Sequence, residues 1–345
     1  MTVSVRERVM VRDTPRVEHL VRRIDVHTHP RDLEESAKST ISQATRLARS
    51  QGVVAICAMP NTRPAITTAA LVDMYLRTAQ NEGCLDGFYL YIGATSNQKQ
   101  LREAVEVVRN NPRVVGIKLY AGKSVGDLAV INEDEQRAVF RYLTELKYTG
   151  ILAAHCEKES LARPELWIPE NPATWNLARP PEMEVESAKD LIKFALSEGF
   201  VGHLHICHAS KPQTVVLVNE AKKRMRISCA ATPHHLSLST DDMRTVEGMR
   251  YKVNPPIRER LMMLKLREYL KQGKIDWIET DHAPHRIEEK TYSPGKPKEA
   301  YMSGIPSLEG FAAFLNSLVY DGFGVKQVEE LTYTNPKKVF TKIIE

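Results

Sequence analysis

The sequence contains 345 residues, of which 42% are hydrophobic, and this length suits either one large α/β domain or two small ones. Its formal net charge of +5 comes from 48 basic and 43 acidic residues spread along the chain, so binding to nucleic acid is not indicated. The first residues are charged where a secretion signal needs an apolar core, and no run reaches the roughly 18 apolar residues of a membrane span. We therefore expect a cytoplasmic protein that does not bind a membrane.

Eight apolar, β-rich segments follow one another along the chain, and segments with helical periodicity such as 98–110 separate them. Strands that alternate with helices form a parallel sheet, and eight of them favour a closed (β/α)8 barrel, the TIM barrel, over an open doubly wound sheet. We expect a short N-terminal extension over 1–20 and one barrel domain over 21–345. The expected strands are 21–29, 52–60, 88–95, 114–120, 151–156, 203–208, 227–232 and 276–281.

Polar residues gather at the carboxyl ends of these strands, which is where a barrel builds its active site. His27 and His29 occupy alternate positions of the first strand, so they share a face and can bind one metal ion. Asp281 ends the last strand, where a buried carboxylate is costly unless it binds a metal or acts as a base. His155 and His208 end two further strands and are candidate ligands for the same reason.

Lys118 lies within the fourth strand, and a lysine inside a barrel is costly to desolvate unless its pKa falls or it is modified. A neutral amine can add carbon dioxide, and the resulting carbamate can bridge two metal ions. The alternative is a lysine that points outward into solvent. His203 and His205, which precede His208 on the same strand, are expected to be structural.

The motifs that carry these residues resemble those of the amidohydrolase superfamily and, within it, the dihydroorotase family. The match runs from about residue 21 to the C-terminus and extends to microbial dihydroorotases and the dihydroorotase domain of the animal multifunctional pyrimidine protein. The motifs are DVHTHPR (25–31), AMPNTRP (58–64), GIKLY (116–120), PHHL (233–236), VNPPIR (253–258) and TDHAPH (280–285).

The resemblance implies a hydrolase of cyclic amides that interconverts N-carbamoyl-L-aspartate and L-dihydroorotate in de novo pyrimidine (UMP) biosynthesis. It implies two zinc ions per chain, a bridging hydroxide that attacks the ring amide, and Asp281 as general acid and base. The implied zinc ligands are His27, His29 and Asp281 for one ion and His155 and His208 for the other, with carboxylated Lys118 bridging both.

For the substrate, the resemblance implies that Arg31, Asn61 and His285 bind the carboxylate. It also implies that Asn254 lies in a segment that holds the ring with main-chain groups. In the mobile loop of the family a threonine commonly closes over the substrate, and this sequence has Ser124 instead. Little or no accessory β-sandwich domain is expected, because only about 20 residues precede the first strand.

The animal enzyme has been associated with a third zinc ion that uses a cysteine and a glutamate. Cys207 is present here, but Ala230 stands where the glutamate would be, so we do not expect a third zinc ion.

Two alternatives stay open. A hydantoinase or allantoinase shares the metal ligands, although its substrate has no carboxylate for Arg31 to bind, and a non-catalytic homologue would only be a scaffold for aspartate transcarbamoylase. The complete ligand set argues against the scaffold. The partner expected is a small-molecule substrate, while a homodimer and association with aspartate transcarbamoylase are left open.

Overall fold

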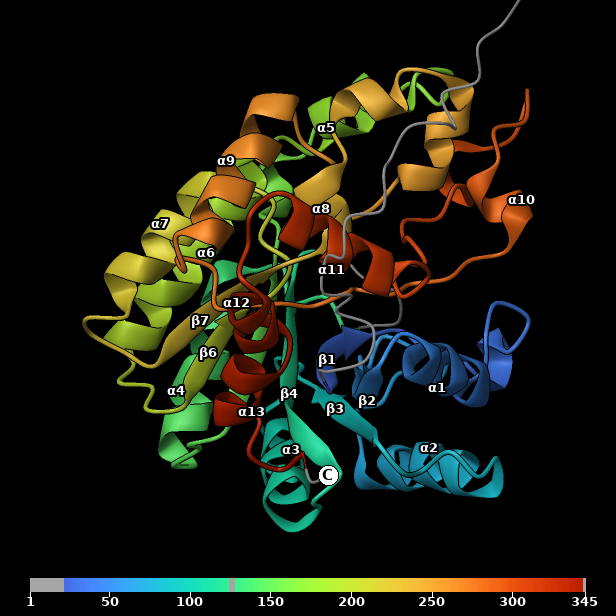
Figure 1. Ribbon diagram of the computed structural model, residues 1–345. Coiled ribbons are helices and arrows are strands. Elements are labelled where there is room, and N and C mark those ends of the chain that lie inside the picture. Colours follow the sequence, from blue (N-terminus) through green and yellow to red (C-terminus); the bar gives the residue numbers. More distant parts are fainter. Residues whose placement is uncertain (1–21, 124–127, 344–345) are drawn as a thin grey trace, which may run out of the picture.

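The computed structural model describes residues 22–123 and 128–343 and contains one eight-stranded parallel sheet (Figure 1). The strands pair in sequence order, so each strand lies between its neighbours in the chain. They are β1 (Arg23–Thr28), β2 (Val53–Ala58), β3 (Phe88–Gly93), β4 (Val114–Ala121), β5 (Ile151–Cys156), β6 (His203–Ile206), β7 (Ile227–Ala231) and β8 (Trp277–Ile278). The expected extension over 1–20 and Ser124 lie outside the described residues.

Contacts between β1 and the chain just after β8 bring the two edges of the sheet together. Thr28 and His282 form a parallel bridge, and the His29 amide donates to the His282 carbonyl at 2.7 Å. The buried Asp25 carboxylate also accepts hydrogen bonds from the amide and hydroxyl of Thr280. The expected barrel is therefore confirmed, with Asp25 holding its two edges together.

Helices occupy the connections between strands and surround the barrel (Figure 1). Some of them begin at a side-chain cap: Asn132 accepts hydrogen bonds from two amides of the first turn of α4, a turn that carries three acidic residues. The longer helices are α1 (Ile41–Ser50), α2 (Ala69–Asn81), α3 (Gln98–Asn110), α4 (Glu133–Glu145), α6 (Glu182–Ser197), α7 (Pro212–Ala221), α9 (Arg260–Lys271) and α11 (Phe311–Tyr320). The shorter ones are α5 (Trp175–Ala178), α8 (Pro233–Ser237), α10 (Ile287–Lys290), α12 (Val325–Glu329) and α13 (Asn335–Val339).

The core has two layers, as a barrel requires. The larger layer lies between strands and helices, and the smaller one fills the barrel with side chains such as Tyr91 and Trp277. Phe340, which follows α13, packs against both of these rings at centroid distances of 6.4 and 5.7 Å. The filled interior leaves only the carboxyl end of the barrel for a site.

Among the helices of the described residues, none is both long and apolar enough to cross a membrane.

Gly116 sets how closely β4 approaches β5, the strands that carry Lys118 and His155. A Cβ atom at Gly116 would lie 2.7 Å from the Ile151 carbonyl oxygen, and this backbone atom cannot move without displacing β5. We predict that Gly116→Ala lowers the free energy of unfolding by about 1–3 kcal/mol, measured by urea denaturation. The control is Gly324→Ala, an exposed site where a Cβ atom meets nothing within 4 Å. Equal losses in both variants would contradict the assignment.

Candidate active site

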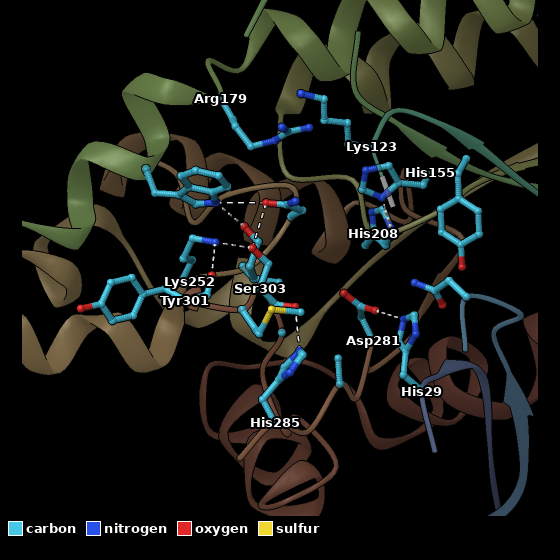
Figure 2. Close-up of a pocket in the computed structure, with 18 of the residues that line it drawn as sticks. His29, Lys123, His155, Arg179, His208, Lys252, Asp281, His285, Tyr301 and Ser303 are labelled. Carbon is cyan, nitrogen blue, oxygen red and sulfur yellow. Dashed lines mark hydrogen bonds and ion pairs between the residues drawn. The ribbon is translucent and has the colours of Figure 1, made fainter. Parts of the chain in front are cut away.

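A cavity of about 400 Å³ opens at the carboxyl ends of the strands (Figure 2). Long connections contribute to its wall, because Trp175 and Arg179 come from the segment after β5 and Tyr301 from the segment after β8. Lys118 does not line the cavity and lies fully buried, and Ser124 is not among the described residues. The lining contains these residues singled out from the sequence: His27, His29, Arg31, Asn61, His155, His208, Asn254, Asp281 and His285.

Three of these residues have backbone conformations that non-glycine residues seldom adopt. The φ angle is 70° at Arg31, 37° at His208 and 48° at Asp281. Such conformations are strained and cluster at functional sites, where the surrounding structure holds them in place. Each one follows a strand end, so the strain turns the side chain into the cavity.

His27, His29 and Asp281 converge on one point. The Asp281 Oδ1 atom lies 3.3 Å from His27 Nε2 and 2.9 Å from His29 Nε2. Ligand atoms roughly 2.0 to 2.1 Å from a tetrahedral zinc ion are about 3.3 Å apart, so this spacing suits a shared metal ion. Burial and Lys118 act to lower the pKa of His27. Its acidic neighbours outweigh them and raise this pKa to about 10; they are Glu279, Cys207 and Asp281. The surroundings of His27 therefore favour a positive charge, which a metal cation supplies.

His155 and His208 form a second group beside the first. His155 Nδ1 faces His208 Nε2 at 3.2 Å, again the spacing of two ligands on one ion. The rings of His27 and His208 have centroids 5.0 Å apart, so the two groups are adjacent. Burial lowers the pKa of His29 to about 4 and holds that of His208 well below its usual value. Both rings are thus neutral, which is the form that binds metals.

Lys118 lies beneath these histidines, and within the described residues no carboxylate is within ion-pair distance of its ammonium group. Its Nζ atom donates to Cys207 Sγ at 3.0 Å. Although burial opposes it, Lys118 lowers the pKa of Cys207 to about 5. A buried lysine whose main polar neighbour is a thiol is compatible with carboxylation, which would replace its positive charge by a metal-binding anion.

Two buried glutamates that the sequence analysis did not assign hold one histidine of each group. Glu279 Oε1 lies 3.0 Å from His27 Nδ1, and Glu157 Oε2 lies 3.0 Å from His155 Nε2. Carboxylates in this position orient metal-binding histidines and determine which ring nitrogen faces the ion. A sequence signal existed for Glu279, because it is an acidic residue within the predicted strand 276–281, two positions before Asp281.

Glu279 also belongs to a second group of potential metal ligands. Its carboxylate, His27 and Cys207 each offer an atom within 4.8 Å of the others. Ala230, on β7, lacks the carboxylate expected for a third zinc ion, but Glu279, which follows β8, places a carboxylate beside Cys207 from another strand. The other Glu279 oxygen lies 2.9 Å from His205 Nε2, and both His205 and His203 bond to Ser228 Oγ.

Residues of the expected carboxylate site lie across the cavity from the second histidine group. An amino group of Arg31 is 3.1 Å from His285 Nε2, which is 3.0 Å from the Ser303 carbonyl oxygen. Burial, followed by Arg31, lowers the pKa of His285 far below its usual value, so the ring is neutral. In a neutral imidazole, Nε2 either donates or accepts a hydrogen bond, so it can bond only one of these two neighbours. When it donates to the Ser303 carbonyl oxygen, the Arg31 amino group keeps its protons for a ligand.

Comparison with known proteins gives the family. No family model matches the sequence. A dihydroorotase from Methanosphaera stadtmanae is 30% identical over 329 residues, which cover 92% of this chain and 70% of that protein. A dihydroorotase from Endomicrobium trichonymphae is 31% identical over 324 residues, which cover 92% of this chain and 72% of that protein. The chain belongs to the dihydroorotase family. This is a family of cyclic amidohydrolases, so the expectation of an enzyme is confirmed.

One more distant sequence relative and two solved structures are also similar to this chain. Multifunctional protein CAD of Squalus acanthias is 26% identical over 322 residues, 92% of this chain but 12% of that protein. An L-hydantoinase from Arthrobacter aurescens superposes with a TM-score of 0.79 at 23% identity, covering 93% of this chain and 71% of that one. A Saccharomyces cerevisiae dihydroorotase in complex with 5-fluoroorotic acid superposes with a TM-score of 0.74 at 16% identity. The match covers 93% of this chain and 84% of that one. These structures show the shared barrel.

The bond between Glu279 and His27 gives a test of the metal site that does not depend on activity. We predict that Glu279→Gln weakens zinc binding about 10- to 100-fold, because the neutral amide no longer fixes the orientation and charge of His27. Zinc affinity is measured by competition with a chromogenic chelator. Glu299→Gln, an exposed residue of the cavity wall, is the matched control and should bind zinc normally. Normal affinity in both variants would remove Glu279 from the site.

Proposed function

We propose that this chain is a dihydroorotase that reversibly cyclises N-carbamoyl-L-aspartate to L-dihydroorotate in de novo pyrimidine biosynthesis. The observation that carries the proposal is the pair Arg31 and His285, 3.1 Å apart in the cavity that also holds His27, His29 and Asp281. Dihydroorotate presents a cyclic amide and a carboxylate, whereas a hydantoin has no carboxylate. The planar guanidinium of Arg31 matches a carboxylate in geometry and charge.

We propose that the cavity holds two zinc ions, and the spacing of the histidine nitrogens supports this. Bound zinc would polarise the amide carbonyl and lower the pKa of water from about 15.7 towards 7. The proposed ligands are His27, His29 and Asp281 for one ion and His155 and His208 for the other, with carboxylated Lys118 between them.

Asp281 moves the proton in the proposed reaction. Although burial opposes it, His27 and His29 hold the pKa of Asp281 well below its usual range, so the carboxylate is ionised. It accepts a proton from the attacking water and delivers it to the ring nitrogen as the bond from carbon to nitrogen breaks. In the proposed carboxylate site, Arg31 and Asn61 donate to the substrate carboxylate. His285, whose Nε2 donates to Ser303, leaves the protons of the Arg31 amino group for that carboxylate, which directs the amide towards Asp281.

The first test is hydrolysis of L-dihydroorotate, followed by ultraviolet absorbance, with zinc content determined on the same sample. We expect turnover with about two zinc ions per chain. A rise in pH should shift the equilibrium from ring closure towards ring opening, because the opened product carries one more carboxylate. Turnover of hydantoin or allantoin but not dihydroorotate would assign the chain to that alternative, and absence of both metal and turnover would favour the scaffold.

Two variants should separate chemistry from binding. Asp281→Asn is expected to lower kcat by about 10²- to 10⁴-fold, because the amide cannot accept the proton. Arg31→Ala is expected to raise KM about 10- to 100-fold, the loss of a charged hydrogen bond, with a smaller change in kcat. Steady-state kinetics on zinc-loaded protein measures both. Near-normal kcat in Asp281→Asn, or normal KM in Arg31→Ala, would overturn the corresponding role.

A single barrel domain, a homodimer and association with aspartate transcarbamoylase remain proposals. The similarity to a segment of a multifunctional protein supports association with another enzyme. Size-exclusion chromatography with light scattering, with and without aspartate transcarbamoylase, tests both assemblies.

A further inference from the structure

Lys252 is a buried lysine in the cavity wall that the proposed reaction does not use. Only 5% of its surface is exposed, and within the described residues no carboxylate lies within ion-pair distance. Its Nζ atom donates to the Tyr301 carbonyl at 2.8 Å and to Ser303 Oγ at 2.9 Å. The same atom lies 4.0 Å from the ring centre of Trp175 and 4.8 Å from that of Trp167.

The charge of Lys252 is costly at this position. Burial, followed by the nearby Arg179, lowers the pKa of Lys252 to about 7. Two hydrogen bonds and two indole faces are what stabilise its ammonium form. A methionine would fill the same space without this cost, because buried charges can often be replaced by apolar groups of similar volume. The position of the ammonium group therefore points to a task beyond packing.

The hydrogen-bond donors around Ser303 and Asn254 indicate what this task is. In its ammonium form Lys252 has no acceptor, so Ser303 Oγ then accepts from Lys252 and directs its own proton elsewhere. Ser303 Oγ lies 3.4 Å from Asn254 Oδ1. Trp175 Nε1, also a donor only, lies 3.0 Å from the same Asn254 oxygen and 3.1 Å from the Val253 carbonyl oxygen, so its one proton is shared between the two.

Asn254 thus has two donors aimed at one end of its amide. Rotating the amide by half a turn would place its NH₂ group against the Trp175 N–H and would lose the hydrogen bond from Ser303 Oγ, so the orientation with the oxygen on that side is favoured. The NH₂ group is the end that remains for a ligand in the cavity. It can donate only to an oxygen acceptor, such as a ring carbonyl or a carboxylate.

The main chain around Lys252 holds this arrangement in place. The Lys252 carbonyl accepts hydrogen bonds from the Gly304 amide at 2.9 Å and from Lys290 Nζ at 2.7 Å. At Gly304, whose φ is 155°, a Cβ atom would lie 2.6 Å from the Ala283 carbonyl oxygen. Segment 301–304 therefore packs closely between Lys252 and the wall that carries His285. Figure 2 shows Lys252, Tyr301 and Ser303 on the side of the cavity away from His155 and His208.

We propose that Lys252 is a positioning residue: acting through Ser303, and together with Trp175, it fixes the Asn254 amide with its NH₂ group towards the cavity, so that Asn254 recognises an oxygen of the substrate ring. This inference rests on the proposed dihydroorotase function and adds a determinant of substrate affinity to it. Lys252 itself does not touch the reacting atoms.

The experiment is a double-mutant cycle between Lys252→Met and Asn254→Ala on zinc-loaded protein with dihydroorotate as substrate. Lys252→Met is expected to raise KM about tenfold and to change kcat less than about threefold, because it releases the Asn254 amide. Asn254→Ala should raise KM by at least as much. The double variant should be no worse than Asn254→Ala alone, because Lys252 has no target once the amide is gone. If the double variant raises KM by the product of the two single effects, the proposal is overturned.

Two further variants guard against a folding defect. Ser303→Ala interrupts the same path with a smaller change in volume, and it should raise KM without adding to Asn254→Ala. Lys298→Met removes an exposed lysine of the same loop that donates to the Trp167 carbonyl, and it should keep normal kinetics. Zinc content and thermal unfolding are measured for every variant. A KM unchanged in both Lys252→Met and Ser303→Ala would overturn the role of Lys252.

The outcomes distinguish this inference from the function on which it rests. A wild-type protein that does not turn over dihydroorotate refutes the proposed function, and the role of Lys252 in that reaction falls with it. If the wild type is active and the effects of Lys252→Met and Asn254→Ala are independent of each other, only the role of Lys252 is refuted.

Discussion

The buried carboxylate of Glu279 is the contact on which the rest of the site depends. It bonds His27 from β1, His205 from β6 and the main-chain amide of His208, so one side chain joins three parts of the barrel. A buried carboxylate is tolerated only when such partners compensate for its lost hydration. Although burial opposes it, His27 and His205 hold the pKa of Glu279 far below its usual value. The residue therefore stays charged and keeps His27 in one orientation.

The cavity combines two kinds of polar wall. The histidines and Asp281 lie at strand ends, in positions held by the sheet and by strained backbone at His208 and Asp281. The opposite wall comes from the segments that contain Asn254 and Ser303, and there the hydrogen bonds of buried lysines replace sheet pairing. In the proposed function, metal binding would thus fall to the rigid part of the barrel and recognition of the substrate to its loops, as is general in this fold.

Local patterns were sufficient to predict the eight strands and the convergence of His27, His29 and Asp281. Alternation within a strand places side chains on one face, and parallel strands bring their carboxyl ends to one edge. Helix α3 has the bounds that its periodicity predicts, Gln98–Asn110. Glu157 and Glu279, each directly after a strand, were missed because the sequence does not show which histidine an acidic residue faces.

The sequence by itself determined the barrel, the ligand residue types and the likeness to dihydroorotases, because these depend on local periodicity and on motifs of contiguous residues. Only the tertiary structure decided which nitrogen of each histidine faces its neighbours and that Glu279 holds His27. It also decided that Lys252 reaches Ser303 across 51 positions of the chain. These contacts depend on distances and on the direction of donors and acceptors between distant segments, and no local pattern encodes them.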